Sequence, residues 1–223
     1  MKAIVFDLGG TLMEYKGMPL SWADYYSIGF SFLNQQYSCA ASDEIINESV
    51  EILKSYNPRL YYREIEYSPR HIMSDALKHW NTNCSIDEMI VSFFEGLHLT
   101  PIIYDEVIPV LQQIKKQKYK IAALTDLPTA MPDDIFKKNI SELLQYFDLY
   151  VSSLSCGFRK PNPQGLIFIS EQFGIDRNEI LFVGDEEKDR NTAINAGCNF
   201  IKINREDNKN DEVCTLQDLM KII

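Results

Sequence analysis

The sequence of 223 residues lacks the cysteine and histidine clusters that identify many small-domain classes. Its five cysteines are odd in number and widely spaced, and no pair has the Cys-x-x-Cys spacing. The three histidines lie in the first half of the chain and form no cluster with them. This pattern argues against a structural zinc site and a disulfide framework. We therefore expect reduced thiols in a cytoplasmic protein; the cysteines are Cys39, Cys84, Cys156, Cys198 and Cys214.

Long apolar runs and basic blocks are also missing. No stretch approaches the roughly 20 apolar residues of a membrane span, and the first apolar run is broken by Asp7, too early for a signal peptide. Lysine and arginine total 22 against 32 acidic residues, which gives a net charge of −10. A nucleic acid or an anionic membrane surface needs clustered cations, so we expect neither as a partner. A small anionic substrate is still compatible, because a bound metal ion can invert the local field.

The sequence does contain a long helical region near its start. The composition, 45% apolar and 24% charged, is that of a globular protein with one large domain or one domain plus an insertion. Helical periodicity dominates residues 15–101, and a serine precedes each expected helix. These serines are Ser21, Ser42, Ser68 and Ser85, the last forming a capping box with Glu88. Because no strand separates these helices, we expect them to pack together as a small bundle.

The second half of the chain alternates between strand and helix. Buried strands are predicted at residues 3–6, 119–124, 147–152, 180–183 and 199–203. Helices are predicted at residues 105–116 and 133–145, from the end of the loop at residue 163 to residue 173, from after Asp185 to residue 196, and after Thr215, with a linker at 204–212. Single helices between strands imply right-handed crossovers and a parallel sheet. The predicted fold is α/β, with a Rossmann-like core of residues 1–14 and 102–223 and an α-helical cap, residues 15–101, inserted after the first strand.

Residues able to do chemistry follow four of the predicted strands. They are Asp7, Thr125, Lys160, Asp185 and, one turn further, Asp189. The carboxyl ends of parallel strands lie on one edge of a sheet, so these residues can converge. Three carboxylates in one pocket repel each other unless a cation joins them, and Mg²⁺ is the hard divalent cation that suits oxygen ligands. A carboxylate nucleophile, a cation, an ammonium group and a hydroxyl group together favour phosphoryl transfer.

These residues resemble the four ordered motifs of the haloacid dehalogenase (HAD) superfamily of hydrolases. The motifs are Asp7-Leu8-Gly9-Gly10-Thr11, then Thr125, then Lys160-Pro161-Asn162-Pro163, and finally Gly184-Asp185 with Asp189. The resemblance covers residues 1–14 and about 102–205, and the helical segment matches the superfamily's inserted cap in position and size.

The resemblance also implies a role for each matched residue. Asp7 is expected to be the nucleophile that becomes an aspartyl-phosphate, while Thr125 and Lys160 hold the phosphoryl oxygens. Mg²⁺ is expected to bind Asp7, the backbone carbonyl of Gly9, Asp185 and Asp189. Substrate contacts are assigned to Gly10, Thr11, Thr125, Asp126 and Lys160, and the expected partner is a small phosphorylated metabolite. The expected reaction is hydrolysis of a phosphate monoester.

One position departs from the family pattern. Phosphatases of the superfamily usually carry a second Asp two residues after the nucleophile, where this chain has Gly9. Another acid, such as Glu14 or a cap residue, can replace it, or the substrate can have a good leaving group. Less favoured alternatives are dehalogenase chemistry and a phosphonatase that uses Lys54 or Lys78. A further alternative is a phospho-ligand-binding protein with little or no turnover on the same scaffold.

Overall fold

The computed structural model describes residues 1–204 and 215–223, so Cys214 and nearly all of the predicted linker 204–212 lie outside the described residues. The chain divides into two compact units. The first comprises Met1–Glu14, Pro101–Asp126 and the described part of Asn139–Ile223, and the second comprises Tyr15–Thr100 and Leu127–Lys138. The stretch Leu127–Lys138 therefore groups with the helical unit, although the sequence analysis counted it with the core. The cap boundary itself stays a prediction.

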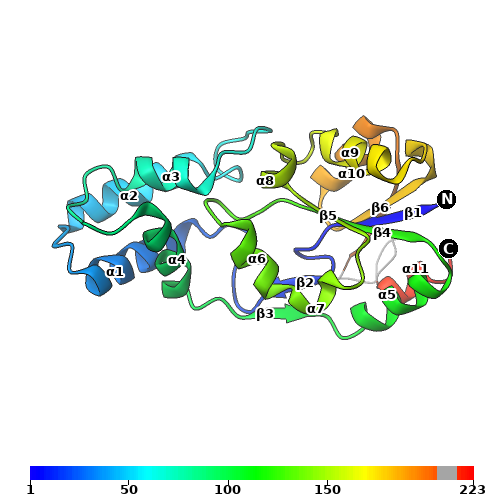
Figure 1. The fold of residues 1–223 in the computed structure, drawn as a ribbon, viewed down its shortest axis with the longest axis horizontal. Coiled ribbons are helices and arrows are strands. Elements are labelled where there is room, and N and C mark those ends of the chain that lie inside the picture. The colour runs from blue at the N-terminus through cyan, green and yellow to red at the C-terminus, as the bar shows by residue number, and fades with distance from the viewer. Residues whose placement is uncertain (205–214) are drawn as a thin grey trace. The chain divides into compact units, whose positions relative to one another are not determined.

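The first unit is built on a five-stranded parallel sheet with the strand order β5-β4-β1-β6-β7 (Figure 1). The strands are β1 (Ala3–Phe6), β4 (Lys120–Thr125), β5 (Leu149–Ser152), β6 (Ile180–Gly184) and β7 (Asn199–Lys202). Every residue of β1 and β6 is buried, because helices cover both faces of the sheet. The predicted α/β class and all five predicted core strands are confirmed. The central strand, β1, is the one that leads to Asp7.

Helices lie on both faces of this sheet. Figure 1 shows α9 (Gln164–Phe173) and α10 (Glu187–Ala196) on one face, and α5 (Val107–Lys116) with α11 (Leu216–Leu219) on the other. On the α9 and α10 side, the core contains alternate strand residues such as Val5 and Phe182, packed with Leu166 and Ala193 from the helices. The alternation follows from the pleat, which sends successive side chains to opposite faces.

The second unit is helical. It contains the 3₁₀ helix η1 (Ala23–Tyr25) and the helices α1 (Tyr26–Tyr37), α2 (Asp43–Ser55), α3 (Pro69–Ala76) and α4 (Ile86–Gly96). The predicted caps Ser42, Ser68 and Ser85 each accept a hydrogen bond from the backbone N–H three residues later. The predicted cap Ser21 is wrong, because η1 intervenes and α1 begins after Tyr25 without a side-chain cap.

Three local features differ from the sequence prediction. The helix predicted at 133–145 is two helices, α6 (Asp133–Asn139) and α7 (Ser141–Leu144), because Ile140 leaves helical geometry. Two unpredicted three-residue strands, β2 (Met13–Tyr15) and β3 (Pro101–Ile103), pair with each other. The short helices α8 (Ser153–Cys156) and η2 (Arg177–Glu179) were also not predicted. Among the described residues, no helix combines the length and apolarity needed to cross a membrane.

Candidate active site

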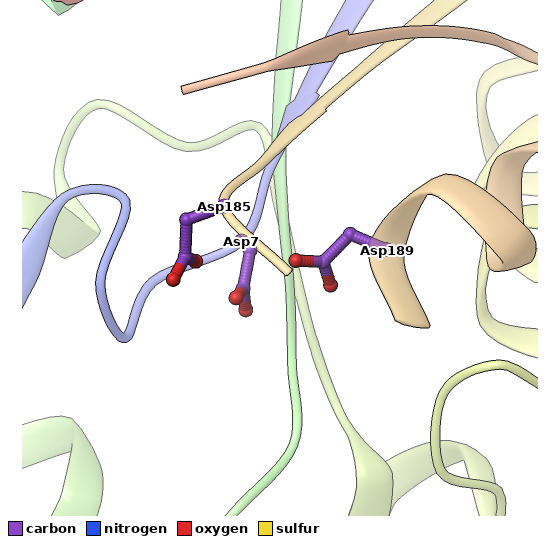
Figure 2. A group of neighbouring side chains, drawn as sticks. All are labelled: Asp7, Asp185 and Asp189. Carbon is purple, nitrogen blue, oxygen red and sulfur yellow. The ribbon is translucent and has the colours of Figure 1, made fainter. Parts of the chain in front are cut away.

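Three carboxylates from distant parts of the chain meet at the carboxyl edge of the sheet. Asp7 follows β1, Asp185 follows β6, and Asp189 lies in the first turn of α10 (Figure 2). One oxygen from each lies within 4.8 Å of the others. The register explains the meeting of the first two, because Phe6 is level with Val183 on the neighbouring strand and the Asp7 N–H donates to the Val183 carbonyl at 2.9 Å.

Two glycines make the close approach of these carboxylates possible. Gly10 has a φ of +78°, and a Cβ atom there would lie 2.2 Å from Asp185 Oδ2. A Cβ atom on Gly184 would lie 2.6 Å from the Asp189 carboxylate. Both distances are far below van der Waals contact, so any side chain at either position must displace a carboxylate. The structure therefore gives Gly10 a packing role beside Asp185, and its predicted contact with substrate stays a prediction.

Hydrogen bonds from the protein fix two of the three carboxylates. The hydroxyl of Thr11, which is fully buried, donates to Asp185 Oδ1 at 2.9 Å. The backbone N–H of Glu186 donates to Asp189 Oδ2 at 2.9 Å, as one half of a capping box at the start of α10. Thr11, predicted to contact substrate, thus already orients a member of the acidic cluster.

Lys160 brings the balancing positive charge. Its Nζ lies 2.7 Å from Asp7 Oδ1 and 2.6 Å from Asp189 Oδ1, and its side chain is only 2% exposed. Burial alone would lower the pKa of Lys160, but the adjacent carboxylates Asp189 and Asp7 raise it above its ordinary value. The group is therefore an ammonium ion at neutral pH.

The acidic cluster carries more negative charge than Lys160 balances. Burial, together with the neighbouring carboxylates Asp189 and Asp185, raises the pKa of Asp7 to about 8 against the opposing effect of Lys160. The pKa of Asp185 is also raised, first by burial and then by Asp189. A divalent cation would remove this cost, and the donors are all oxygen atoms of the kind that Mg²⁺ prefers. The residues present therefore fit a Mg²⁺ ion.

The remaining predicted residues lie in the same compact unit as this cluster. Thr125 is buried at the end of β4, the strand next to β1, and Asp126 follows it. Gly9 is exposed, and no atom lies within 4 Å of the position a Cβ atom would take. Glu14, proposed as a replacement acid, accepts a hydrogen bond from the Tyr104 hydroxyl at 3.0 Å.

Lys54 and Lys78, the two candidate Schiff-base lysines, lie in the helical unit and form ion pairs there. Lys54 pairs with Glu51 at 2.8 Å and Lys78 with Glu48 at 3.4 Å. Lys188, which was not among the predicted site residues, pairs with Asp126 and Glu186 beside the acidic cluster. Its position directly before Asp189 was the available signal.

A family model described as haloacid dehalogenase-like hydrolase matches residues 1–197. That match covers most of the chain and includes every member of the acidic cluster and Lys160. The chain belongs to the haloacid dehalogenase-like hydrolases.

Sequence relatives of this HAD-like hydrolase are phosphatases. It is 25% identical over 205 residues to the phosphoglycolate phosphatase of Vibrio vulnificus (strain CMCP6), a match that covers 89% of this chain and 81% of the relative. It is 32% identical over 110 residues to the phosphoglycolate phosphatase of Pasteurella multocida, which covers 47% of this chain and 46% of that protein. These relatives identify the chain as a phosphatase-like member of the HAD superfamily.

Solved structures share the fold of this HAD-like hydrolase without distinguishing its chemistry. A HAD phosphatase from Thermococcus onnurineus aligns with a TM-score of 0.64 at 20% identity, covering 100% of this chain and 97% of that one. A 2-haloacid dehalogenase from Pseudomonas syringae pv. Tomato aligns with a TM-score of 0.67, also at 20% identity and over the same shares. Because a phosphatase and a dehalogenase fit equally well, the reaction must be argued from the site residues.

Proposed function

We propose that the protein is a Mg²⁺-dependent phosphatase that hydrolyses a small phosphate monoester through an aspartyl-phosphate at Asp7. The observation that carries the proposal is the convergence of Asp7, Asp185 and Asp189 around the ammonium group of Lys160. A haloalkanoate substrate would need no divalent cation, so it would not account for three carboxylates held together, two of them buried. The phosphatase relatives support the same choice.

Each residue of the cluster has a distinct task in this proposal. The Asp7 carboxylate attacks phosphorus, and the ester oxygen leaves with the electron pair of the broken P–O bond and takes a proton from solvent. Water then attacks the phosphorus of the aspartyl-phosphate, the P–O bond to Asp7 breaks, and phosphate leaves with the Asp7 carboxylate restored. Lys160 and the Thr125 hydroxyl bind the phosphoryl oxygens and neutralise their charge. Asp7, the Gly9 carbonyl, Asp185 and Asp189 hold Mg²⁺. When bound, Mg²⁺ supplies charge neutralisation for the phosphoryl oxygens and keeps the Asp7 carboxyl group ionised.

Gly9 restricts the substrates that fit this proposal. A glycine can neither protonate the leaving oxygen nor take a proton from the attacking water, and the loss of such a group typically costs about 10²–10⁴ in rate. The proposed substrates are therefore phosphate esters or acyl phosphates whose leaving groups need little protonation. Phosphoglycolate, the substrate named for the relatives, is included in the test as an alkyl phosphate whose leaving alkoxide does need a proton.

The same glycine supports a second candidate function, a phospho-ligand-binding protein with little turnover. A screen of phosphorylated metabolites, including 2-phosphoglycolate and p-nitrophenyl phosphate, with and without Mg²⁺ separates the two functions. Phosphate release that needs Mg²⁺ and is lost in Asp7→Asn, but kept in the exposed control Asp105→Asn, supports the phosphatase. Mg²⁺-dependent binding without phosphate release supports the binding protein. Release that persists in EDTA contradicts both.

A further inference from the structure

Asp126 is a buried carboxylate that lies beside the acidic cluster without belonging to it. Its side chain is 8% exposed, and its Oδ1 accepts a hydrogen bond of 3.1 Å from the backbone N–H of Lys160. Since Asp126 directly follows β4, this bond ties the end of that strand to the loop that carries Lys160. The loop continues through Pro161, which has no N–H group of its own to donate.

The second oxygen of Asp126 faces a lysine of α10. Lys188 Nζ lies 3.6 Å from Asp126 Oδ2 and 3.0 Å from Glu186 Oε1. Glu186 and Asp189 form the capping box that begins α10. The ion pair therefore connects Asp126 to the turn that carries Asp189.

The charge of Asp126 is maintained despite its burial. Burial alone raises the pKa of this carboxyl group, but the cations Arg159, Lys188 and Lys160 hold the pKa below its ordinary value. Asp126 is thus an anion at neutral pH. An anion in this position repels a phosphate group, and both of its oxygens already face protein donors, so the contacts favour a role toward the protein over a contact with substrate.

We propose that Asp126 and Lys188 form a positioning pair that holds the Lys160 loop against the end of β4 and the start of α10. Asp126 fixes the backbone of Lys160, and Lys188 fixes the orientation of the Asp126 carboxylate. The Lys160 ammonium is then placed between Asp7 and Asp189 before any substrate binds. This inference rests on the role proposed above for Lys160.

The test compares Asp126→Ala and Asp126→Asn with Asp148→Ala. Asp148 is a matched control, because its Oδ2 accepts a 2.9 Å hydrogen bond from the backbone N–H of Ile121 near the opposite end of β4. Two quantities are measured for each variant: hydrogen exchange of the Lys160 amide, which needs no activity, and kcat and KM for the best substrate of the screen.

Asp126→Ala is expected to speed exchange of the Lys160 amide and to lower kcat by up to about 100-fold, the cost of a misplaced catalytic group. Asp126→Asn is expected to retain most of the wild-type protection of the Lys160 amide and most of the wild-type kcat, because its amide oxygen accepts from the same N–H group. Asp148→Ala is expected to lower thermal stability without changing kcat. Lys188→Met is expected to lower kcat in the wild type but not further in the Asp126→Asn background.

Two results overturn the proposal. One is a kcat for Asp126→Ala that falls no further than that of Asp148→Ala. The other is an Asp126→Asn variant as impaired as Asp126→Ala. If Asp126→Ala does not fold, the double-mutant cycle of Asp126→Asn and Lys188→Met decides. Additive effects of these two substitutions on kcat overturn the proposal. If the wild type releases no phosphate, the proposed function fails, and amide exchange alone decides: unchanged Lys160 protection in Asp126→Ala overturns the positioning role.

Discussion

The most informative perturbation is the replacement of Gly9 by aspartate. The resemblance to HAD phosphatases implies an Asp at this position that protonates the leaving group, whereas this chain has Gly9, which has no side chain. Gly9 is exposed, does not have a positive φ, and has no atom within 4 Å of the place where a Cβ atom would lie. We therefore expect Gly9→Asp to fold normally, with a change in the free energy of unfolding within about 1 kcal/mol.

The expected gain in kcat/KM follows from the surroundings of the new aspartate side chain. Its carboxyl group would lie two residues from Asp7 and next to Gly10, which abuts Asp185, and neighbouring carboxylates raise the pKa of a further acid. A pKa raised toward neutrality suits a general acid, and such a group contributes about 10²–10⁴ in rate. We expect Gly9→Asp to raise kcat/KM for alkyl phosphates by at least about tenfold, the lower part of that range allowing for an unoptimised geometry. For p-nitrophenyl phosphate, whose leaving group needs no proton, we expect little change.

The assay is phosphate release from a series of esters whose leaving groups span a wide range of pKa. In the wild type, log kcat/KM is expected to fall steeply as the leaving-group pKa rises, and in Gly9→Asp the slope is expected to become shallower. Gly9→Asn is the control for shape, because its amide cannot donate an acidic proton. A flat series in the wild type would contradict the reasoning, since it would reveal another acid. So would equal slopes for the Asp and Asn variants.

Three further predictions follow from the acidic cluster. Gly10→Ala is expected to weaken Mg²⁺ binding measured by calorimetry, because the new Cβ must displace Asp185, whereas Gly9→Ala is expected to bind normally; equal affinities would contradict this. Without metal, the raised pKa of Asp7 stabilises the fold below its ordinary pKa, and this contribution is lost as the pH rises toward about 8. The increase in Tm caused by Mg²⁺ is therefore expected to be larger at pH 8 than at pH 6. A smaller increase at pH 8 would contradict the upward direction of the Asp7 pKa shift. Lys160→Met is expected to lower the free energy of unfolding in EDTA by about 3–5 kcal/mol at neutral pH, because it leaves the buried Asp189 carboxylate without its ion-pair partner. Chemical denaturation checks this value, and an unchanged midpoint would contradict it.

The sheet could be predicted because its strands carry their signal locally. β1 and β6 are short apolar runs that end at a glycine or an aspartate, and such runs need no partner to be recognised. The signal for three helix starts is equally local, because each capping serine directly precedes the helix that it caps: Ser42, Ser68 and Ser85. The strands β2 and β3 were missed because three residues give too little pattern, and their pairing joins segments far apart in the chain.

The convergence of the acidic residues could be predicted from the sequence, but their contacts could not. The convergence of Asp7 with Asp185 follows from adjacent parallel strands, so the motif order was enough. The sequence could not indicate that Thr11 donates to Asp185, or that Asp126 accepts from the Lys160 backbone, because both contacts depend on the paths of loops. The steric requirement for glycine at position 10 could not be predicted either. In the sequence Gly10 indicates only a flexible turn, whereas in the structure a side chain there would collide with Asp185.

The central claim is that Asp7 is the nucleophile, and trapping of the covalent intermediate tests it most directly. The protein is mixed with an excess of the best substrate and Mg²⁺, quenched in acid, and examined by intact mass and peptide mapping. The account predicts one added phosphoryl group, located on Asp7, and none in Asp7→Asn. Turnover accompanied by a phosphoryl group on another residue, or trapping that is unaffected by Asp7→Asn, would contradict it.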